Sequence, residues 1–241
     1  MSPELLHALA IAGAPGIAIS LLIYMLDGHD REPARLLIRC FLLGVLSVIL
    51  PLTLQVLAAS AGWTAAVPGL FNKAVFAFGV VGFSEELGKF LVLRYYAFRK
   101  PAFDEPFDGI VYSVMIGMGF ATAENISYVL QFGIGTGWVR MFISVPAHAA
   151  FAVLMGYYAG LAKFIPQHRG TLLFTGLFWA IAFHGAFDFF LFIGNSLFLV
   201  MASVFCLYIG IRLSVKAIRQ HRELSARWRG RYGPQLEDEE E

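Results

Sequence analysis

Two adjacent glutamates and a lysine lie inside an otherwise apolar stretch of the chain, VVGFSEELGKFLVLRYY at residues 80–96. On a helix, Lys89 shares a face with Glu85, four residues earlier, and with Glu86, three residues earlier. A buried carboxylate beside a second carboxylate and an ammonium group can accept a proton and return it, which is the task of a general base. We therefore interpret this stretch as a candidate acid–base site.

Further polar residues interrupt the apolar sequence downstream. They are Glu124 with Asn125, then His148, and then His184 with Asp188. Because His184 and Asp188 are four residues apart, Asp188 could accept a hydrogen bond from one imidazole nitrogen and fix its tautomer. Each charge at the middle of a bilayer costs about 2.5–3.5 kcal/mol on insertion scales, so this many of them predicts a functional site.

Carboxylates combined with histidines suit the activation of water and the stabilisation of an oxyanion. Other hydrolytic designs lack their signatures, since the sequence has no HExxH helix and no GxSxG turn. An aspartate-pair intramembrane protease needs two membrane aspartates, and only Asp188 lies well inside an apolar stretch. These residues predict a glutamate-activated water without a metal ion or other cofactor. Metal ligation stays open as the alternative, with Glu85, His148, His184 and Asp188 as ligands.

The elements that must position these residues are predicted to be membrane-spanning helices. Hydrophobic residues make up 58% of the chain and charged residues only 15%, and the mean hydropathy is +0.68. Continuous apolar runs of about 20 residues can each cross about 30 Å of hydrocarbon. The fold class predicted is an all-α, polytopic membrane bundle of about seven transmembrane helices, at residues 5–26, 36–59, 70–98, 107–132, 139–165, 171–193 and 196–218.

Lysines and arginines are unevenly distributed between alternate loops, and cytoplasmic loops normally carry the excess. The first, third and fifth loops and the C-terminal end are basic, whereas the opposite side carries only Lys73 and Arg140. We therefore predict an N-terminus outside and a C-terminus in the cytoplasm. One transmembrane domain is expected over residues 1–218, followed by a charged cytoplasmic tail, expected to be disordered, over residues 219–241.

The predicted topology also places the polar residues in depth. At about 1.5 Å per residue, the intramembrane carboxylates and histidines lie about 9–18 Å from the outer ends of their spans. Four helices would then bring polar groups to one layer, between the midplane and the outer surface. Independent structural residues would scatter in depth, so we expect one water-filled site. The residues in this layer are Glu85, Glu124, His148, His184 and Asp188.

The motifs in these four helices resemble those of the PrsW family of membrane proteases. They are E-E-x-x-K at Glu85–Lys89, GFATAENISY around Glu124, HAAFAVLMG from His148, and H-x-x-x-D at His184–Asp188. The match covers predicted spans three to six, and the order of the motifs is more specific than any one of them. The family is similar to a wider group that includes the CAAX prenyl endopeptidases and bacterial immunity-type membrane proteases.

The resemblance implies a glutamic-type intramembrane protease. In the CAAX relatives the paired glutamates, two histidines and a polar residue four after the second histidine form the catalytic cavity. Those relatives usually have an arginine four after the second glutamate and an asparagine in the last motif. Here Lys89 lies three after it and Asp188 replaces the asparagine, which favours PrsW. The catalytic residues implied are Glu85, Glu86, His148, His184 and Asp188.

As a working hypothesis, Glu85 is the general base on a water, and His148 orients that water or assists proton transfer. His184, held by Asp188, donates to the tetrahedral oxyanion. The supporting residues are Lys89, which with Glu86 tunes the base, and Glu124 and Asn125. The outer position of the layer predicts a cut near the extracytoplasmic face of a single-pass membrane protein in the lipid bilayer.

The best-known members of the PrsW family make the first cut in an anti-sigma factor, which the resemblance extends to this chain as a candidate substrate. We expect a multi-pass protein of a bacterial inner membrane, and nothing in the charge pattern supports nucleic-acid binding. Two alternatives stay open. Buried carboxylates and histidines also form the relays of proton-coupled transporters, and a non-catalytic scaffold could retain the fold.

Overall fold

The computed structural model describes residues 2–28, 31–194 and 196–237, and side chains as far as residue 230. Every secondary-structure element in these ranges is helical, so the predicted all-α class is confirmed. The elements are α1 (Pro3–Leu26), α2 (Ala34–Ser47), α3 (Ile49–Ser60), α4 (Leu70–Ala74), the π-helix η1 (Val75–Gly82), α5 (Phe83–Tyr95), η2 (Ala97–Arg99), α6 (Asp108–Phe132), α7 (Ile134–Phe142), α8 (Ser144–Phe164), η3 (Pro166–His168), α9 (Arg169–Ile193) and α10 (Leu197–Glu237).

Five helical stretches among the described residues are long and apolar enough to cross a membrane. They are Pro3–Leu26, Ala34–Ser60, Ile134–Phe164, Pro166–Ile193 and Leu197–Gly230. The predicted spans 70–98 and 107–132 are not among them, because α5 carries the charged motif and α6 is rich in small and polar residues. The outward side chains of the bundle are large and apolar, including Leu42, Val56, Phe174 and Phe205, as expected of a surface that faces lipid.

Helix α6 is the central element of the bundle, because almost every residue from Asp108 to Thr122 is buried. Its crossing with α8 is close because glycines face each other. A Cβ atom added at Gly109 would lie 2.4 Å from Gly160 N, and one added at Gly156 would lie 2.4 Å from Gly109 O. The small residues therefore allow direct backbone contact, which is how helices associate where lipid replaces water.

A second close approach joins the π-helix η1 to α9. A Cβ atom added at Gly82 would lie 3.2 Å from Gly185 N, and one added at Gly185 would lie 2.3 Å from Phe78 Cδ1. π-helical turns are uncommon and frequently occur beside functional sites. Here η1 ends at the residue before α5, so it brings the start of α5, with Glu85 and Glu86, against His184 on α9.

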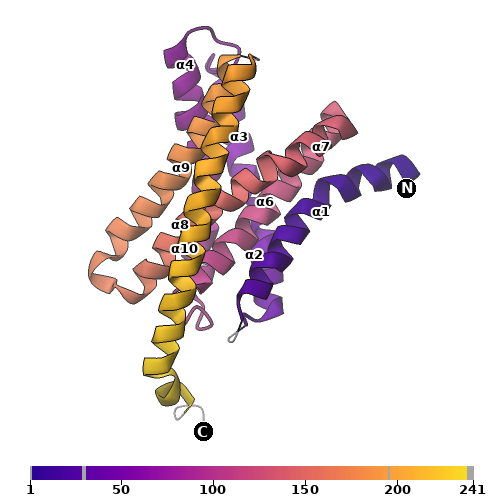
Figure 1. Cartoon of the computed structure of the whole chain (residues 1–241). Helices are drawn as coiled ribbons and strands as arrows, with labels where there is room; N and C mark the ends of the chain where they lie inside the picture. Colours follow the sequence, from indigo (N-terminus) through magenta and orange to yellow (C-terminus); the bar gives the residue numbers. More distant parts are fainter. Residues whose placement is uncertain (1, 29–30, 195, 238–241) are drawn as a thin grey trace.

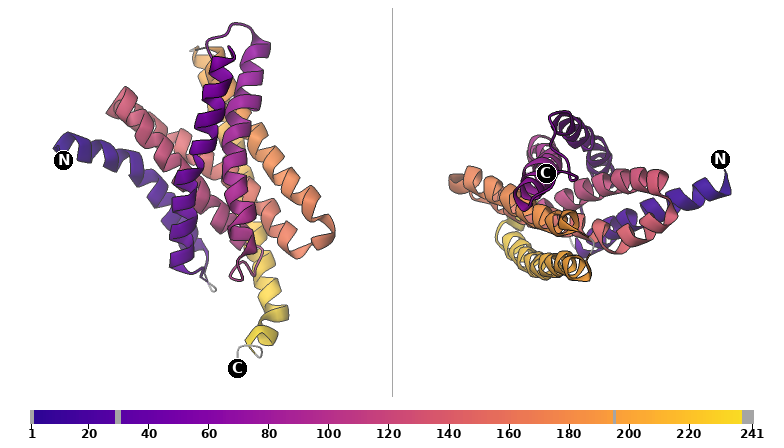
Figure 2. Two further views of the ribbon diagram at one scale, coloured as in Figure 1. Left: turned by 180° about the vertical axis from the view of Figure 1, so that it is seen from behind. Right: turned by 90° about the horizontal axis from the view of Figure 1, so that it is seen from above.

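The two ends of the chain behave differently from the compact centre. Figures 1 and 2 show the N-terminal part of α1 and the short helix α7 diverging from the rest of the bundle side by side. At the other end, α10 projects beyond the neighbouring helices (Figure 1). A charged tail expected to be disordered is predicted from residue 219, whereas α10 continues as one helix to Glu237. Residues 238–241 lie outside the described residues.

Candidate active site

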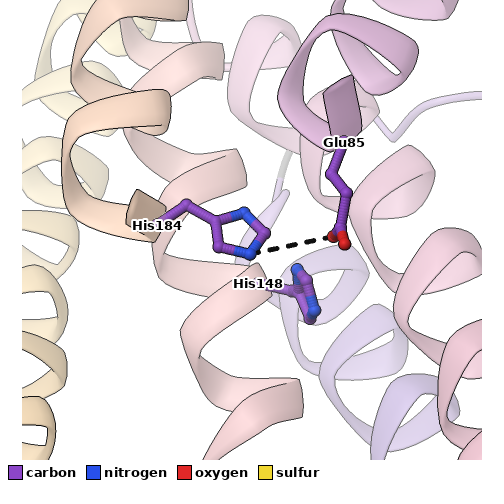
Figure 3. A group of neighbouring side chains, drawn as sticks. All are labelled: Glu85, His148 and His184. Atoms are coloured by element: carbon purple, nitrogen blue, oxygen red, sulfur yellow. Dashed lines mark ion pairs between the residues drawn. The ribbon is translucent and has the colours of Figure 1, made fainter. Parts of the chain in front are cut away.

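Glu85 lies in the first turn of α5 and is almost completely buried, with 5% of its surface exposed. Figure 3 shows its carboxylate turned toward His184, with the ring of His148 beside the pair. The distance from Glu85 Oε2 to His184 Nε2 is 3.7 Å. Gln55 on α3 approaches the other oxygen, with Nε2 3.5 Å from Oε1. No hydrogen-bond donor among the described residues reaches this buried Oε2 atom, so it can still accept a hydrogen bond from a water or a substrate group.

Glu86 joins two cationic or proton-donating groups. Its Oε1 atom accepts a hydrogen bond from Lys89 Nζ at 2.6 Å and from His184 Nδ1 at 2.7 Å. Glu86 is fully buried, and burial of an isolated carboxylate would be costly, so the lysine and the imidazole stabilise it in place. The adjacent glutamates thus have different surroundings: Glu86 accepts two short hydrogen bonds, and the nearest donor to Glu85 is Gln55 Nε2 at 3.5 Å.

Lys89 connects the glutamates to the second histidine. Its Nζ atom lies 3.0 Å from His148 Nδ1 and 4.0 Å from Glu85 Oε2. Since an ammonium group can only donate, His148 Nδ1 is the acceptor in this contact. The ammonium also lies 4.1 Å from the centre of the Phe120 ring, a cation–π contact that partly replaces its lost water.

His148 is fixed from its other side by Glu124 on α6. His148 Nε2 donates to Glu124 Oε2 at 2.9 Å, which agrees with the acceptor role of Nδ1. Arg140 Nη2 on α7 lies 2.7 Å from the same Glu124 oxygen, and its guanidinium lies 3.9 Å from the centre of the Tyr128 ring. A line of contacts therefore runs from Arg140 through Glu124 to His148.

His184 presents its Nε2 atom to two carboxylates. Besides the contact with Glu85, Nε2 lies 3.4 Å from Asp188 Oδ2. The ring stacks on Phe151 with centroids 5.2 Å apart and lies 5.1 Å from the ring of His148. Because two carboxylate oxygens face one nitrogen, this edge of the site favours a proton or a cation between them.

The predicted site residues meet with one exception. Glu85, Glu86, Lys89, His148, His184, Asp188 and Glu124 form one connected cluster from α5, α6, α8 and α9. Asn125 instead faces α1, where Nδ2 donates to Ala12 O at 3.0 Å, and accepts from Arg140 Nε. Asp188 is predicted to orient His184, and its Oδ2 atom lies 3.4 Å from Nε2. Glu86 makes the shorter contact, 2.7 Å from Nδ1.

Two residues of the cluster were missed, Arg140 and Gln55. The sequence indicates for Arg140 only a charge in an outer loop, and Gln55 lies in an apolar span without a motif. Neither has a local spacing signal, because each reaches the cluster from a helix that contributes no other member. The amphipathic pattern of α7, with buried Gly137 and exposed Trp138 and Val139, could have indicated that Arg140 faces inward.

The cluster has the chemical parts of a hydrolytic centre. Glu85 Oε2 and Glu86 Oε2 are buried and have no donor among the described residues, and the orientation of the two neighbouring imidazoles is fixed by carboxylates. One ligand-type atom from each of Glu85, His148 and His184 lies within 4.8 Å of the other two. Such a set can activate water, or hold a metal ion that does so.

Comparison with known proteins agrees with this chemistry. A family model described as "PrsW family intramembrane metalloprotease" matches residues 32–213. The relatives named "Protease PrsW" include one from Geobacillus kaustophilus, 37% identical over 73% of this chain and 75% of that protein. Another, from Bacillus subtilis, is 34% identical over 88% of this chain and 96% of that protein. No solved structure matches the chain.

The family model spans most of the chain and includes all four motifs of the cluster. The match to the Bacillus subtilis protein extends over nearly its whole length. An intramembrane hydrolase also agrees with buried carboxylates and histidines among helices that can cross a membrane. The chain therefore belongs to the PrsW family of intramembrane proteases.

Proposed function

We propose that Glu85, His148 and His184 form the hydrolytic centre of this protease and that it cuts a single-pass membrane protein. The supporting observation is the convergence of these three residues from three different helices, with one potential ligand or proton-transfer atom of each within 4.8 Å. Each histidine is also held on its far side by a carboxylate, His184 by Glu86 and His148 by Glu124. Random burial of polar residues does not give both imidazoles such a partner.

In the proposed reaction Glu85 removes a proton from water, and the water oxygen attacks the carbonyl carbon of the scissile peptide bond. The negative charge that develops on the carbonyl oxygen is stabilised by the Nε2 proton of His184 and by the ammonium group of Lys89. The tetrahedral intermediate then collapses, the carbon–nitrogen bond breaks, and Glu85 returns its proton to the leaving amine. Glu86 and Glu124 keep the two rings in position throughout.

The family description names a metalloprotease, and the side chains of the cluster match the ligands of catalytic zinc sites. Two histidines and one glutamate are a common ligand set for catalytic zinc, and carboxylates on the far ring nitrogens are the usual second layer of support. Glu86 and Glu124 supply that layer here. Lys89 Nζ is the group that would have to move from His148 Nδ1. The residues fit, and a bound metal would polarise the carbonyl and acidify its water.

The same proposal includes a topology of seven spans over residues 1–218, with the N-terminus outside and the C-terminus in the cytoplasm. Helices α6 and the η1–α5 segment would then cross the membrane inside the bundle, shielded from lipid by the five apolar stretches. The basic residues near the α8–α9 turn and along the end of α10 support this orientation. The cut would lie near the extracytoplasmic face, and an anti-sigma factor is the candidate substrate.

The experiment uses the full-length protein in liposomes with a single-pass substrate. That substrate is identified as the membrane protein that accumulates uncut in cells carrying Glu85→Gln. Cleavage should fall by at least about 100-fold in Glu85→Gln and in His184→Ala, because each removes a group that moves a proton. The exposed residues Glu4 and His168 provide matched controls, and Glu4→Gln and His168→Ala should cleave normally. Full activity in both site variants would overturn the proposal.

Metal content is measured on the same preparations. A metal held by the proposed set should be present in the unaltered protein and lost in His184→Ala, while His168→Ala retains it. If the unaltered protein cleaves its substrate after complete metal removal, the glutamate-activated water acts alone. If metal removal abolishes cleavage and the same metal restores it, Glu85 acts as a ligand in the metal-dependent reaction.

A further inference from the structure

A second group of buried carboxylates lies at the other end of α6. Asp27 ends α1, Glu105 lies in the loop before α6, and Asp108 is the first residue of α6. All three are at most 3% exposed. One carboxylate oxygen from each lies within 4.8 Å of the other two. Asp108 and Glu124 are sixteen residues apart on α6, about 24 Å along the helix, so this group is separate from the active site.

Asp108 carries the observation that a cluster of acids alone would lack. Its Oδ2 atom accepts hydrogen bonds from the main-chain N–H groups of Asp104, at 2.9 Å, and Glu105, at 2.7 Å. Its Oδ1 atom has no hydrogen-bond donor among the described residues, although the residue is fully buried. The Asp108 carboxyl is part of the cluster, because one of its oxygens lies within 4.8 Å of an oxygen of Asp27 and an oxygen of Glu105. A buried carboxyl oxygen without a donor is costly, and a bound cation can stabilise it.

The surroundings add negative charge. Glu32 is 5% exposed, lies within hydrogen-bonding reach of the Asp108 carboxyl, and accepts a hydrogen bond from the Tyr112 hydroxyl. Arg229 on α10 pairs with Glu105. The ammonium group of Lys163 donates instead to the backbone carbonyls of Phe98 and Lys100. Four carboxyl groups thus gather at one place, and Arg229 forms an ion pair with one of them.

The cluster also has a route to solvent. A cavity of about 350 Å³ is lined by Asp27 and Glu105 and, from α10, by Arg219, Arg222, Glu223 and Arg229. We propose that Asp27, Glu105 and Asp108, with Glu32 beside them, bind one hard divalent cation such as Ca²⁺ or Mg²⁺. Carboxylate oxygens are the ligands that these ions prefer, and oxygens on opposite sides of one Ca²⁺ lie about 4.6–5.2 Å apart. The ion joins the end of α1 to the start of α6.

The experiment measures thermal unfolding and calorimetric binding with the full-length protein in detergent after divalent ions are removed. Added Ca²⁺ or Mg²⁺, up to about 10 mM, should raise the melting temperature saturably and bind with a stoichiometry of one. The preferred ion is the one that saturates at the lower concentration. Asp108→Asn and Glu105→Gln should each weaken binding at least tenfold. Exposed Asp104 offers the matched control, and Asp104→Asn should bind as the unaltered protein does.

Arg229→Gln removes the guanidinium that competes with a bound cation for Glu105. It should tighten binding at least threefold. Misfolding would weaken binding, so it cannot imitate the expected result. Glu85→Gln and His184→Ala should retain the effect of Ca²⁺ or Mg²⁺, which separates this site from the active site. The proposal is overturned if the unaltered protein shows no saturable binding. It is also overturned if sodium chloride at equal ionic strength gives the same stabilisation, or if Asp108→Asn binds normally.

Discussion

The two ends of α6 hold buried charges in opposite ways. Near Glu124, the carboxylates of the active site alternate with Lys89, Arg140 and two histidines, and most contacts are 2.6–3.0 Å long. Near Asp108, four carboxyl groups gather and Arg229 forms an ion pair with one of them. Buried carboxylate oxygens without a donor among the described residues occur in both clusters. A balanced cluster fixes side chains in place without outside help. A cluster with more carboxylates offers more oxygen ligands to a hard cation, which is the role proposed for the Asp108 end of α6.

The largest effect should follow from unbalancing the active site at Glu86. Glu86→Gln leaves Lys89 and the imidazole of His184 without their shared carboxylate, and loss of one partner from a buried ion pair costs about 3–5 kcal/mol. We expect cleavage to fall at least about 100-fold and the melting temperature to fall with it. Cleavage in liposomes and thermal unfolding in detergent measure both. Glu85→Gln should lose activity with a smaller loss of stability, and equal losses in the two variants would contradict the different surroundings of the two glutamates.

A smaller effect is expected from Arg140, a positioning residue that acts on His148 through Glu124. Removing a group that orients a catalytic residue typically costs about 10–100-fold, so Arg140→Gln should lower kcat by that amount with little change in KM. Arg140→Lys should restore part of the rate, since it keeps the charge but not the two-point contact. A purely structural role would lower stability in both variants and leave kcat per folded molecule unchanged.

The crossing of α6 and α8 beside Asp108 should be sensitive to a single methyl group. Gly109→Ala places a Cβ atom against the α8 backbone, and overpacking of this kind costs about 1–3 kcal/mol. Gly170 on α9 has no atom within 4 Å of an added Cβ and gives the matched control. Thermal unfolding should therefore show a lower melting temperature for Gly109→Ala than for Gly170→Ala. Equal values would mean that α6 and α8 are less closely packed than described.

The smallest effect is expected for Asp104→Asn. Asp104 is exposed and contributes its main-chain N–H, rather than its carboxylate, to the Asp108 contact. Surface substitutions usually change stability by less than about 0.5 kcal/mol. Both cleavage and the stabilisation by added Ca²⁺ should therefore match the unaltered protein, and a large change in either would show that the carboxylate of Asp104 belongs to the ion site.

The sequence was informative where charge contradicted hydropathy. Glu85, His148 and His184 were identifiable because ionisable groups are rare in apolar stretches, and their approach to one another follows from that rule. The sequence does not indicate a site at Asp27, Glu32 and Glu105, because acidic residues between helices are usually solvated. These residues are buried only by the packing of the loops. Arg140 and Gln55 were missed for a related reason, since their partners lie far away in the sequence.

Some local geometry also differed from a simple reading of the spans. The expected span 36–59 is divided at Val48 into α2 and α3, and the span 139–165 is divided at Ile143 into α7 and α8. Average hydropathy contains no signal for the breaks, but each lies three residues before a proline, Pro51 or Pro146, which lacks the N–H that a helix needs. The second break has a consequence for the site, because it turns α7 so that Arg140 reaches Glu124.

The most direct test is an experimental structure of the Glu85→Gln variant with its uncut substrate bound. The account predicts that the scissile carbonyl lies between the side chain at position 85 and His184, with its carbon about 3–3.5 Å from a water held at position 85. A substrate whose scissile bond lies against another part of the bundle, out of reach of Glu85, His148 and His184, would contradict the account.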